Sequence, residues 1–246
     1  MDIYFNDIAT YPNELITVVL NHFTNNPNFS IIQHKDLCTE GLFEAIGEYG
    51  YSLGSEAFFS SVQNILSKYQ FIGYHVTRLA NPDSVLRDGL TAFDRNIQWS
   101  RINEALTQNG IEVCRVEAAK LRFLSLEKRF KTLESTHKIC LSAPRETANE
   151  YLFFANNFGG ETAYCAFNND EWVDVYNVLT GIGCPYIVTA KFEYTHASDK
   201  HKIDRIMIAS ILSCKLLGKE YVRGLDIHLE QAIPPSQIIG IDRITI

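Results

Sequence analysis

The sequence predicts an α+β protein, because helical and strand-like segments are interspersed along the chain and the final third is rich in strands. Residues 1–68 carry apolar side chains at helical spacing, whereas residues 69–246 combine short β-branched or aromatic runs with helices. We therefore expect an N-terminal helical cap over residues 1–68 and a separate domain over residues 69–246. The sequence lacks a P-loop motif and a Rossmann glycine motif after a strand, which argues against those two classes.

The composition is that of an ordinary globular protein. The chain has 246 residues, of which 46% are hydrophobic and 21% charged, enough for a sizeable core. Its first residues lack the basic and apolar regions of a signal peptide, and no run of about 18 apolar residues occurs. These features predict a cytoplasmic protein that does not bind a membrane.

Charge and cysteine content narrow the classes further. The formal net charge of −7 argues against a protein whose whole surface grips nucleic acid, but it leaves room for a local basic patch. The cysteines are far apart and form no C-x-x-C pair, so we expect buried free thiols and no metal site. They are Cys38, Cys114, Cys140, Cys165, Cys184 and Cys214.

Three helical runs are predicted in the cap. The first begins after Pro12, the second covers about residues 37–49, and the third covers residues 55–69. The cap contains no motif with a chemical interpretation. We expect it to serve as an interaction module for a partner protein.

The pattern changes at residues 71–78, where aromatic and β-branched side chains predict a strand that contains His75. A turn at residues 81–83 then begins a short helix at residues 84–87, which Gly89 ends. Residues 100–134 are expected to be largely helical. They contain a basic cluster of Lys120, Arg122, Lys128, Arg129 and Lys131. Glutamates alternate with these basic residues, which favours a solvated helix face over a binding surface.

A second strand is predicted at residues 138–142, followed by a helix whose apolar face includes Ala148 and Tyr151. The pair Gly159-Gly160 ends this helix. The remaining predictions are a strand at residues 163–167, a helix at 169–179, a strand at 186–194, a connection over 198–222 and strands at 225–230 and 238–244.

The strand at residues 225–230 has the clearest alternation. Leu225, Ile227 and Leu229 share one face, and the polar residues between them share the other with Glu230. Proline has no N–H to donate, so Pro234-Pro235 stops the strand pairing. The open face is suited to hold a fixed functional carboxylate. The alternative is an ordinary half-exposed edge strand whose polar face is only solvated.

Three segments together resemble the core of the ADP-ribosyltransferase superfamily. They are residues 74–90, with Tyr74-His75 and a helix of the x-x-I-L-x-x-G-L kind; residues 139–151; and residues 228–238, with Glu230 before an I-P-P bend. This superfamily includes bacterial mono-ADP-ribosylating toxins, DNA-modifying toxins and poly(ADP-ribose) polymerases. The resemblance covers residues 71–246.

The resemblance implies a split antiparallel sheet and a reaction that uses NAD as a substrate. Glu230 would be the catalytic carboxylate, which stabilises an oxocarbenium-like transition state and deprotonates the acceptor. His75 and Thr77 would hold a ribose of NAD. Ser142 and Tyr151 would line the nicotinamide pocket, although a tyrosine on an apolar helix face is also a common core residue.

A rival site lies at the glycine pair, where Gly160 and Glu161, together with His228, would bind NAD or the acceptor. A helix stop with a surface glutamate is the equally plain alternative. The chain also departs from the arginine-modifying toxins, because its second strand lacks their Ser-Thr-Ser motif and His228 stands where they have Glu or Gln. This departure puts arginine in doubt as the acceptor.

We therefore expect an NAD-dependent ADP-ribosyltransferase, as a bacterial toxin or a phage-defence effector, that modifies a macromolecule. As a toxin it would contact an antitoxin or another partner protein through the cap of residues 1–68. The basic cluster, with Lys215, Lys219 and Arg223, favours single-stranded RNA or DNA over protein as the acceptor. A non-catalytic domain of the same fold that binds an NAD-like ligand or a partner is the alternative.

Overall fold

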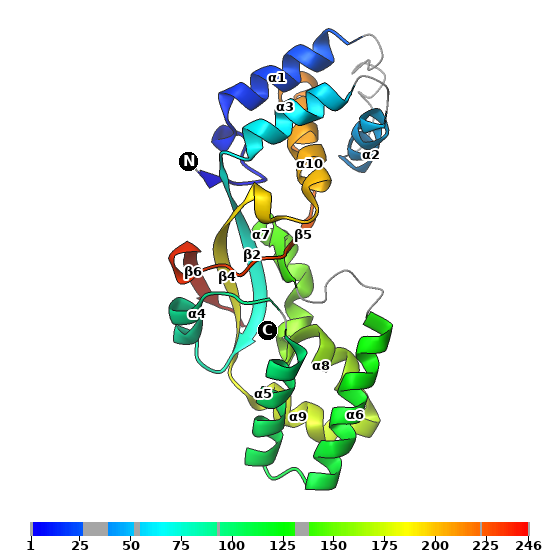
Figure 1. Ribbon diagram of the computed structural model, residues 1–246, viewed down its shortest axis with the longest axis vertical. Helices are drawn as coiled ribbons and strands as arrows, with labels where there is room; N and C mark the ends of the chain where they lie inside the picture. Colours follow the sequence, from blue (N-terminus) through cyan, green and yellow to red (C-terminus); the bar gives the residue numbers. More distant parts are fainter. Residues whose placement is uncertain are drawn as a thin grey trace. The chain divides into compact units, whose positions relative to one another are not determined.

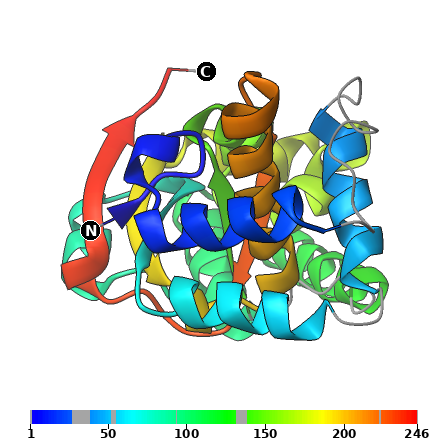
Figure 2. The same cartoon turned by 90° about the horizontal axis from the view of Figure 1, so that it is seen from above.

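The computed structural model describes residues 2–26, 39–51, 55–92, 94–130, 138–221 and 223–245 (Figures 1 and 2). Within these residues the chain mixes helices with one six-stranded sheet, which confirms the predicted combination of α and β structure. The strand order is β5-β3-β2-β4-β6, with β1 paired to β2. The strands are β1 (Asp2–Ile3), β2 (Gln70–Leu79), β3 (Ile139–Ala143), β4 (Cys184–Glu193), β5 (Leu225–Leu229) and β6 (Ile238–Arg243).

The sheet contains both kinds of strand pair. β4 and β6 pair antiparallel, and the short β1 pairs parallel with β2. The α-helices among the described residues are α1 (Asn13–Thr24), α2 (Thr39–Gly50), α3 (Glu56–Leu66), α4 (Asp83–Asp88), α5 (Arg95–Gln108), α6 (Val113–Phe130), α7 (Arg145–Ala148), α8 (Gly160–Phe167), α9 (Val173–Gly181) and α10 (Lys200–Leu212). Among the short helices, the 3₁₀ helix η3 (Asn149–Asn156) links α7 to the segment before α8.

The chain divides into two compact units. The first consists of Met1–Gly73, Ser142–Pro144 and Lys191–Ile227. The second consists of Tyr74–Leu141, Arg145–Ala190 and His228–Ile246. The predicted helical cap therefore lies in a unit that also takes in a much later segment of the chain.

That later segment supplies α10, which lies among α1, α2 and α3 in the first unit (Figures 1 and 2). The connection predicted over residues 198–222 is wrong, because residues 200–212 form this helix. Apolar side chains of α10 are buried around its circumference, including Ile203, Ile206 and Ile208. A helix that is buried on every side shows no polar face, so its sequence lacks the amphipathic pattern that predicts a helix.

A buried carboxylate ties α10 to its neighbours. Tyr194 Oη donates to Asp204 Oδ1 at 2.6 Å, and Gln63 Nε2 of α3 donates to Asp204 Oδ2 at 2.8 Å. Asp204 is fully buried. Burial opposes the charged form more strongly than the two hydrogen bonds support it, and this raises the pKa of Asp204 to about 6.

We expect Asp204→Asn to stabilise the protein at pH 7. An unfolded aspartate titrates near pH 4, so between pH 4 and 6 the folded state retains a proton that the unfolded state has lost. The stability of the wild type should therefore fall as the pH rises through this window, by about 3 kcal/mol for a shift of two pKa units. Urea unfolding at pH 4, 5, 6 and 7 measures this loss. If the free energies of unfolding of the wild type and Asp204→Asn changed by the same amount between pH 4 and 7, the prediction would be contradicted.

In the second unit, α5, α6, α8 and α9 pack around a shared apolar core (Figure 1). The core includes Trp99, Phe123, Phe167 and Trp172. The strand predicted at residues 163–167 is wrong, because these residues form the second half of α8. An apolar run of only five residues does not distinguish a strand from a helix by its periodicity.

The cysteines differ from the prediction of buried thiols. The five described cysteines are free; Cys114, Cys140 and Cys165 are exposed, and Cys184 and Cys214 are half-buried. The prediction of burial is therefore wrong for these five. At Cys140 the reason is the alternation of β3, which turns the thiol away from the face that buries Ile139 and Leu141. Cys38 lies outside the described residues. None of the helices in the described ranges is long and apolar enough to cross a membrane.

Candidate functional site

Glu230 directly follows β5, whose alternation is confirmed. Leu225, Ile227 and Leu229 are buried, whereas His228 is half-buried and Glu230 is exposed. The apolar face of β5 anchors the strand. The predicted catalytic carboxylate therefore stands at the open end of a strand whose position is set by core packing.

His75 lies on β2 and contacts the neighbouring strand. Its Nδ1 lies 2.9 Å from the backbone carbonyl oxygen of Cys140 in β3. A carbonyl only accepts hydrogen bonds, so Nδ1 donates, and Nε2 of the neutral ring is left as an acceptor. Burial lowers the pKa of His75, which keeps the ring neutral at pH 7. His75 is thus prepared to accept a hydrogen bond from a hydroxyl group.

The α4 segment contacts the segment that follows Glu230. Leu90 and Ile233 exchange two backbone hydrogen bonds, with N···O distances of 2.9 and 2.8 Å. Gly89 has a φ of +76°, and a Cβ atom there would lie 2.1 Å from the carbonyl oxygen of Ile233. Glycine at this position therefore both ends α4 and allows the two segments to approach.

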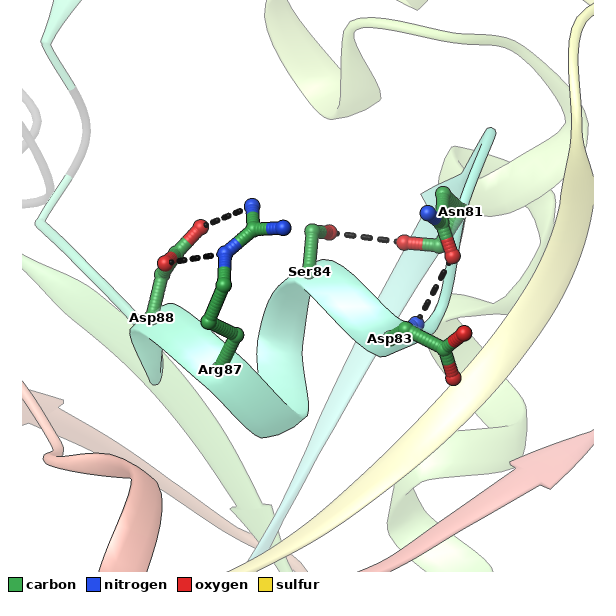
Figure 3. Close-up of polar contacts among 5 residues, drawn as sticks. All are labelled: Asn81, Asp83, Ser84, Arg87 and Asp88. Carbon is green, nitrogen blue, oxygen red and sulfur yellow. Dashed lines mark hydrogen bonds and ion pairs between the residues drawn. The ribbon is translucent and has the colours of Figure 1, made fainter.

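Short-range contacts start and end α4 (Figure 3). The Asn81 side chain accepts a hydrogen bond from the backbone N–H of Asp83 at 2.9 Å, and Ser84 Oγ donates to the Asn81 carbonyl at 2.7 Å. Arg87 and Asp88 form a bidentate ion pair at the exposed end of the helix. The predicted turn and short helix are confirmed, and local side chains explain them.

Three further predicted residues occupy different surroundings. Thr77 is half-buried and lies two residues after His75 on β2, so both side chains share a face of the strand. Tyr151 is half-buried on η3, and its ring stacks on Phe154 with centroids 6.2 Å apart. Ser142 is buried on β3 and belongs to the first unit.

The rival glycine site lies at the start of α8. Gly159 and Gly160 have φ angles of +116° and +61°, which the chain needs to enter the helix. A Cβ on Gly159 would lie 2.6 Å from that of Ala163, whereas one on Gly160 would meet open space. Glu161, in the first turn, is exposed, yet partial desolvation of its carboxylate raises its pKa. The glycine pair therefore starts a helix, in addition to following the one that it was predicted to end.

Arg78 organises the second unit, and the sequence analysis missed it. Its guanidinium donates to the carbonyl oxygens of Ile182 at 2.6 Å, Ala155 at 3.2 Å and Gly183 at 3.1 Å, and also to that of Thr180. These carbonyls end η3 and α9, where carbonyls lack helical partners. The signal in the sequence that could have identified Arg78 is that it is a single arginine in a predicted strand with no carboxylate.

We expect Arg78→Ala to destabilise the protein by about 2 kcal/mol or more, because lost charged hydrogen bonds and unsatisfied carbonyls each cost ~1–3 kcal/mol. Arg78→Lys should recover part of the loss. Chemical denaturation measures it, with Arg87→Ala as the control because Arg87 makes only a surface ion pair. Equal stability of the two alanine variants would show that the four contacts contribute little.

A surface cavity of about 400 Å³ lies elsewhere in the second unit, between the α5–α6 turn and the start of α9. Arg115, Ala118 and Asp174 are among its lining residues, and no predicted site residue is. The part of the chain that the structure describes holds no group of three or more His, Cys, Asp or Glu side chains suited to a metal ion.

We compared the chain with models of known protein families, with curated proteins and with solved structures, and none of them matched.

Proposed function

We propose that the chain is an NAD-dependent ADP-ribosyltransferase that modifies a macromolecule, as a bacterial toxin or phage-defence effector. One observation supports this most: segments far apart in the sequence that together resemble the superfamily lie side by side. β2, β3 and β5 are consecutive in the sheet, His75 bonds to β3, and Leu90 pairs with Ile233. The resemblance requires these segments to be neighbours, and their order in the sheet meets this requirement.

The proposed chemistry uses two side chains. The neutral Nε2 of His75 accepts a hydrogen bond from a ribose hydroxyl of NAD and positions it. The bond between ribose C1′ and the nicotinamide nitrogen breaks, its electron pair leaves with nicotinamide, and positive charge develops on the ribose. The Glu230 carboxylate stabilises that charge and takes the proton of the acceptor group as it attacks C1′. Thr77 and Tyr151, which lie in the same unit as His75 and Glu230, are the further candidates for NAD contacts.

The test uses NAD labelled on its adenylate part, incubated with the protein and a cell extract. Consumption of NAD with label transferred to macromolecules supports the proposal. Label removed by nuclease identifies a nucleic-acid acceptor, for which single strands are expected to be better substrates than duplex because no base must be flipped out. Label removed by protease identifies a protein acceptor. No NAD consumption and no transfer would refute the proposal and favour a non-catalytic binding domain.

We expect His75→Ala to weaken NAD binding by about 3–10-fold, the usual value of one neutral hydrogen bond, with a smaller effect on kcat. His75→Gln is the matched control, because its amide can donate to the Cys140 carbonyl and also accept a hydrogen bond. Since the pKa of His75 is lowered from about 6.5, binding should be constant near pH 7–8 and weaken only well below pH 6.5. Calorimetric titration that gives the same affinity for wild type and His75→Ala would exclude the ribose contact.

A further inference from the structure

One long part of the second unit carries no cation. No lysine, arginine or histidine occurs from Glu146 to Ala190, and this stretch is rich in aromatic residues. Its acidic residues are Glu146, Glu150, Glu161, Asp170, Glu171 and Asp174. The side chains that η3, α8 and α9 themselves supply are therefore acidic and aromatic, and the cations that contact these helices, Arg78, Arg115 and Arg122, come from β2 and α6.

Aromatic rings from η3 and α8 meet on this surface. The Phe153 ring lies 5.5 Å from Tyr164 and 4.0 Å from Phe154, between centroids, and Phe154 lies 5.8 Å from Tyr164. Phe153 is 41% exposed, and Tyr164 is half-buried. The cluster is therefore accessible, unlike the buried aromatic core of α5, α6, α8 and α9.

Each of the two contacting rings has a carboxylate one turn before it. Glu150 precedes Phe153 by three residues in the 3₁₀ helix η3, where residues at that spacing eclipse one another. Glu161 precedes Tyr164 by three residues in α8, where that spacing also places side chains on one face. Because Phe153 and Tyr164 touch, two carboxylates and two rings fall on one patch.

The two carboxylates differ from that of Asp174 in the same stretch. Asp174 pairs with Arg115, which also donates to the Glu171 carbonyl. Within the part of the chain that the structure describes, Glu150 and Glu161 form no ion pair. The partial desolvation that raises the pKa of Glu161 is a cost that a bound cation would reduce.

We propose that this aromatic–acidic patch, defined by Glu150, Phe153, Glu161 and Tyr164, binds a basic segment of a protein partner. A guanidinium group stacks on the exposed face of Phe153 beside Tyr164 and forms hydrogen bonds with the carboxylates of Glu150 and Glu161. Arginine suits the patch better than lysine, because its planar group both stacks and donates bidentately. Phosphate groups would be repelled, so a nucleic-acid acceptor has to bind elsewhere on the chain. This inference does not depend on the proposed transferase activity.

Fluorescence anisotropy of labelled hexa-arginine, titrated with the full chain at low ionic strength, tests the proposal. Hexa-lysine and single-stranded oligo-deoxythymidylate are the comparison probes. We expect hexa-arginine to bind several-fold more tightly than hexa-lysine, and Glu150→Gln with Glu161→Gln to weaken its binding by about tenfold. Phe153→Leu, which keeps an apolar side chain but removes the ring, should weaken it several-fold.

The matched control is Glu104→Gln with Glu117→Gln, which removes the same charge from exposed positions of α5 and α6. It should leave binding nearly unchanged. Equal weakening by the two double variants would mean general attraction to an acidic protein and would overturn the proposal. The proposal would also be overturned if hexa-arginine did not bind, or if Phe153→Leu bound it as tightly as the wild type. Binding of oligo-deoxythymidylate that Phe153→Leu weakens would overturn it as well. Far-ultraviolet circular dichroism confirms that each variant is folded.

Discussion

Glu230→Gln is expected to lower NAD turnover by about 10²–10⁴-fold, the usual contribution of a general base, while the protein remains folded. The amide has almost the shape of the carboxylate, but it neither stabilises the positive ribose nor accepts the proton of the acceptor. Glu230 is exposed and follows the buried residues of β5, so the substitution leaves core packing intact. Nicotinamide release and thermal unfolding measure the two effects separately.

Asp226→Asn is the matched control for Glu230→Gln. Asp226 is exposed on the polar face of the same strand, and the substitution removes the same charge. It should leave turnover within about twofold of the wild type, since the removal of one exposed surface charge usually has a small effect. Near wild-type turnover in Glu230→Gln, or equal losses in both variants, would remove Glu230 from the proposed mechanism.

Removal of residues 1–68 is expected to leave a chain that does not fold. The deletion takes away α1, α2 and α3, which cover α10. Buried side chains of α10 such as Ile206, Ile208 and Ile211 would be exposed, and each contributes about 1.5–3 kcal/mol when buried. Several such losses together reach the 5–15 kcal/mol of an ordinary domain. Solubility, and the cooperativity of unfolding of any soluble fraction, measure the outcome.

Co-expression provides the control for this deletion. If the deletion prevents folding because it exposes the buried side chains of α10, then residues 1–68 expressed as a separate chain should restore a soluble complex with residues 69–246. A monomeric chain of residues 69–246 that unfolds cooperatively would instead show that the predicted boundary at residue 68 separates two independent domains.

Local patterns in the sequence determined much of the framework. The alternation along β5 predicted which of its side chains are buried, and the turn at Asn81 with the stop at Gly89 predicted α4. Each of these elements has one buried face or a local hydrogen bond, and such features leave a periodic or short-range signal. The resemblance identified His75 and Glu230 as candidates. The carbonyl oxygen of Cys140, 65 residues away, decides which ring nitrogen of His75 donates and which one can accept a hydrogen bond.

Only the tertiary structure decided the elements without such a signal. α10 is surrounded by protein, so its sequence shows no polar face, and α8 contributes an apolar run too short to show a period. Arg78 finds its carbonyl partners 77–105 residues away, and Phe153 meets Tyr164 from a different helix. The sequence by itself determined which face of β5 is apolar and where α4 begins and ends. Contacts between distant segments decided the rest, because they form only when those faces pack together.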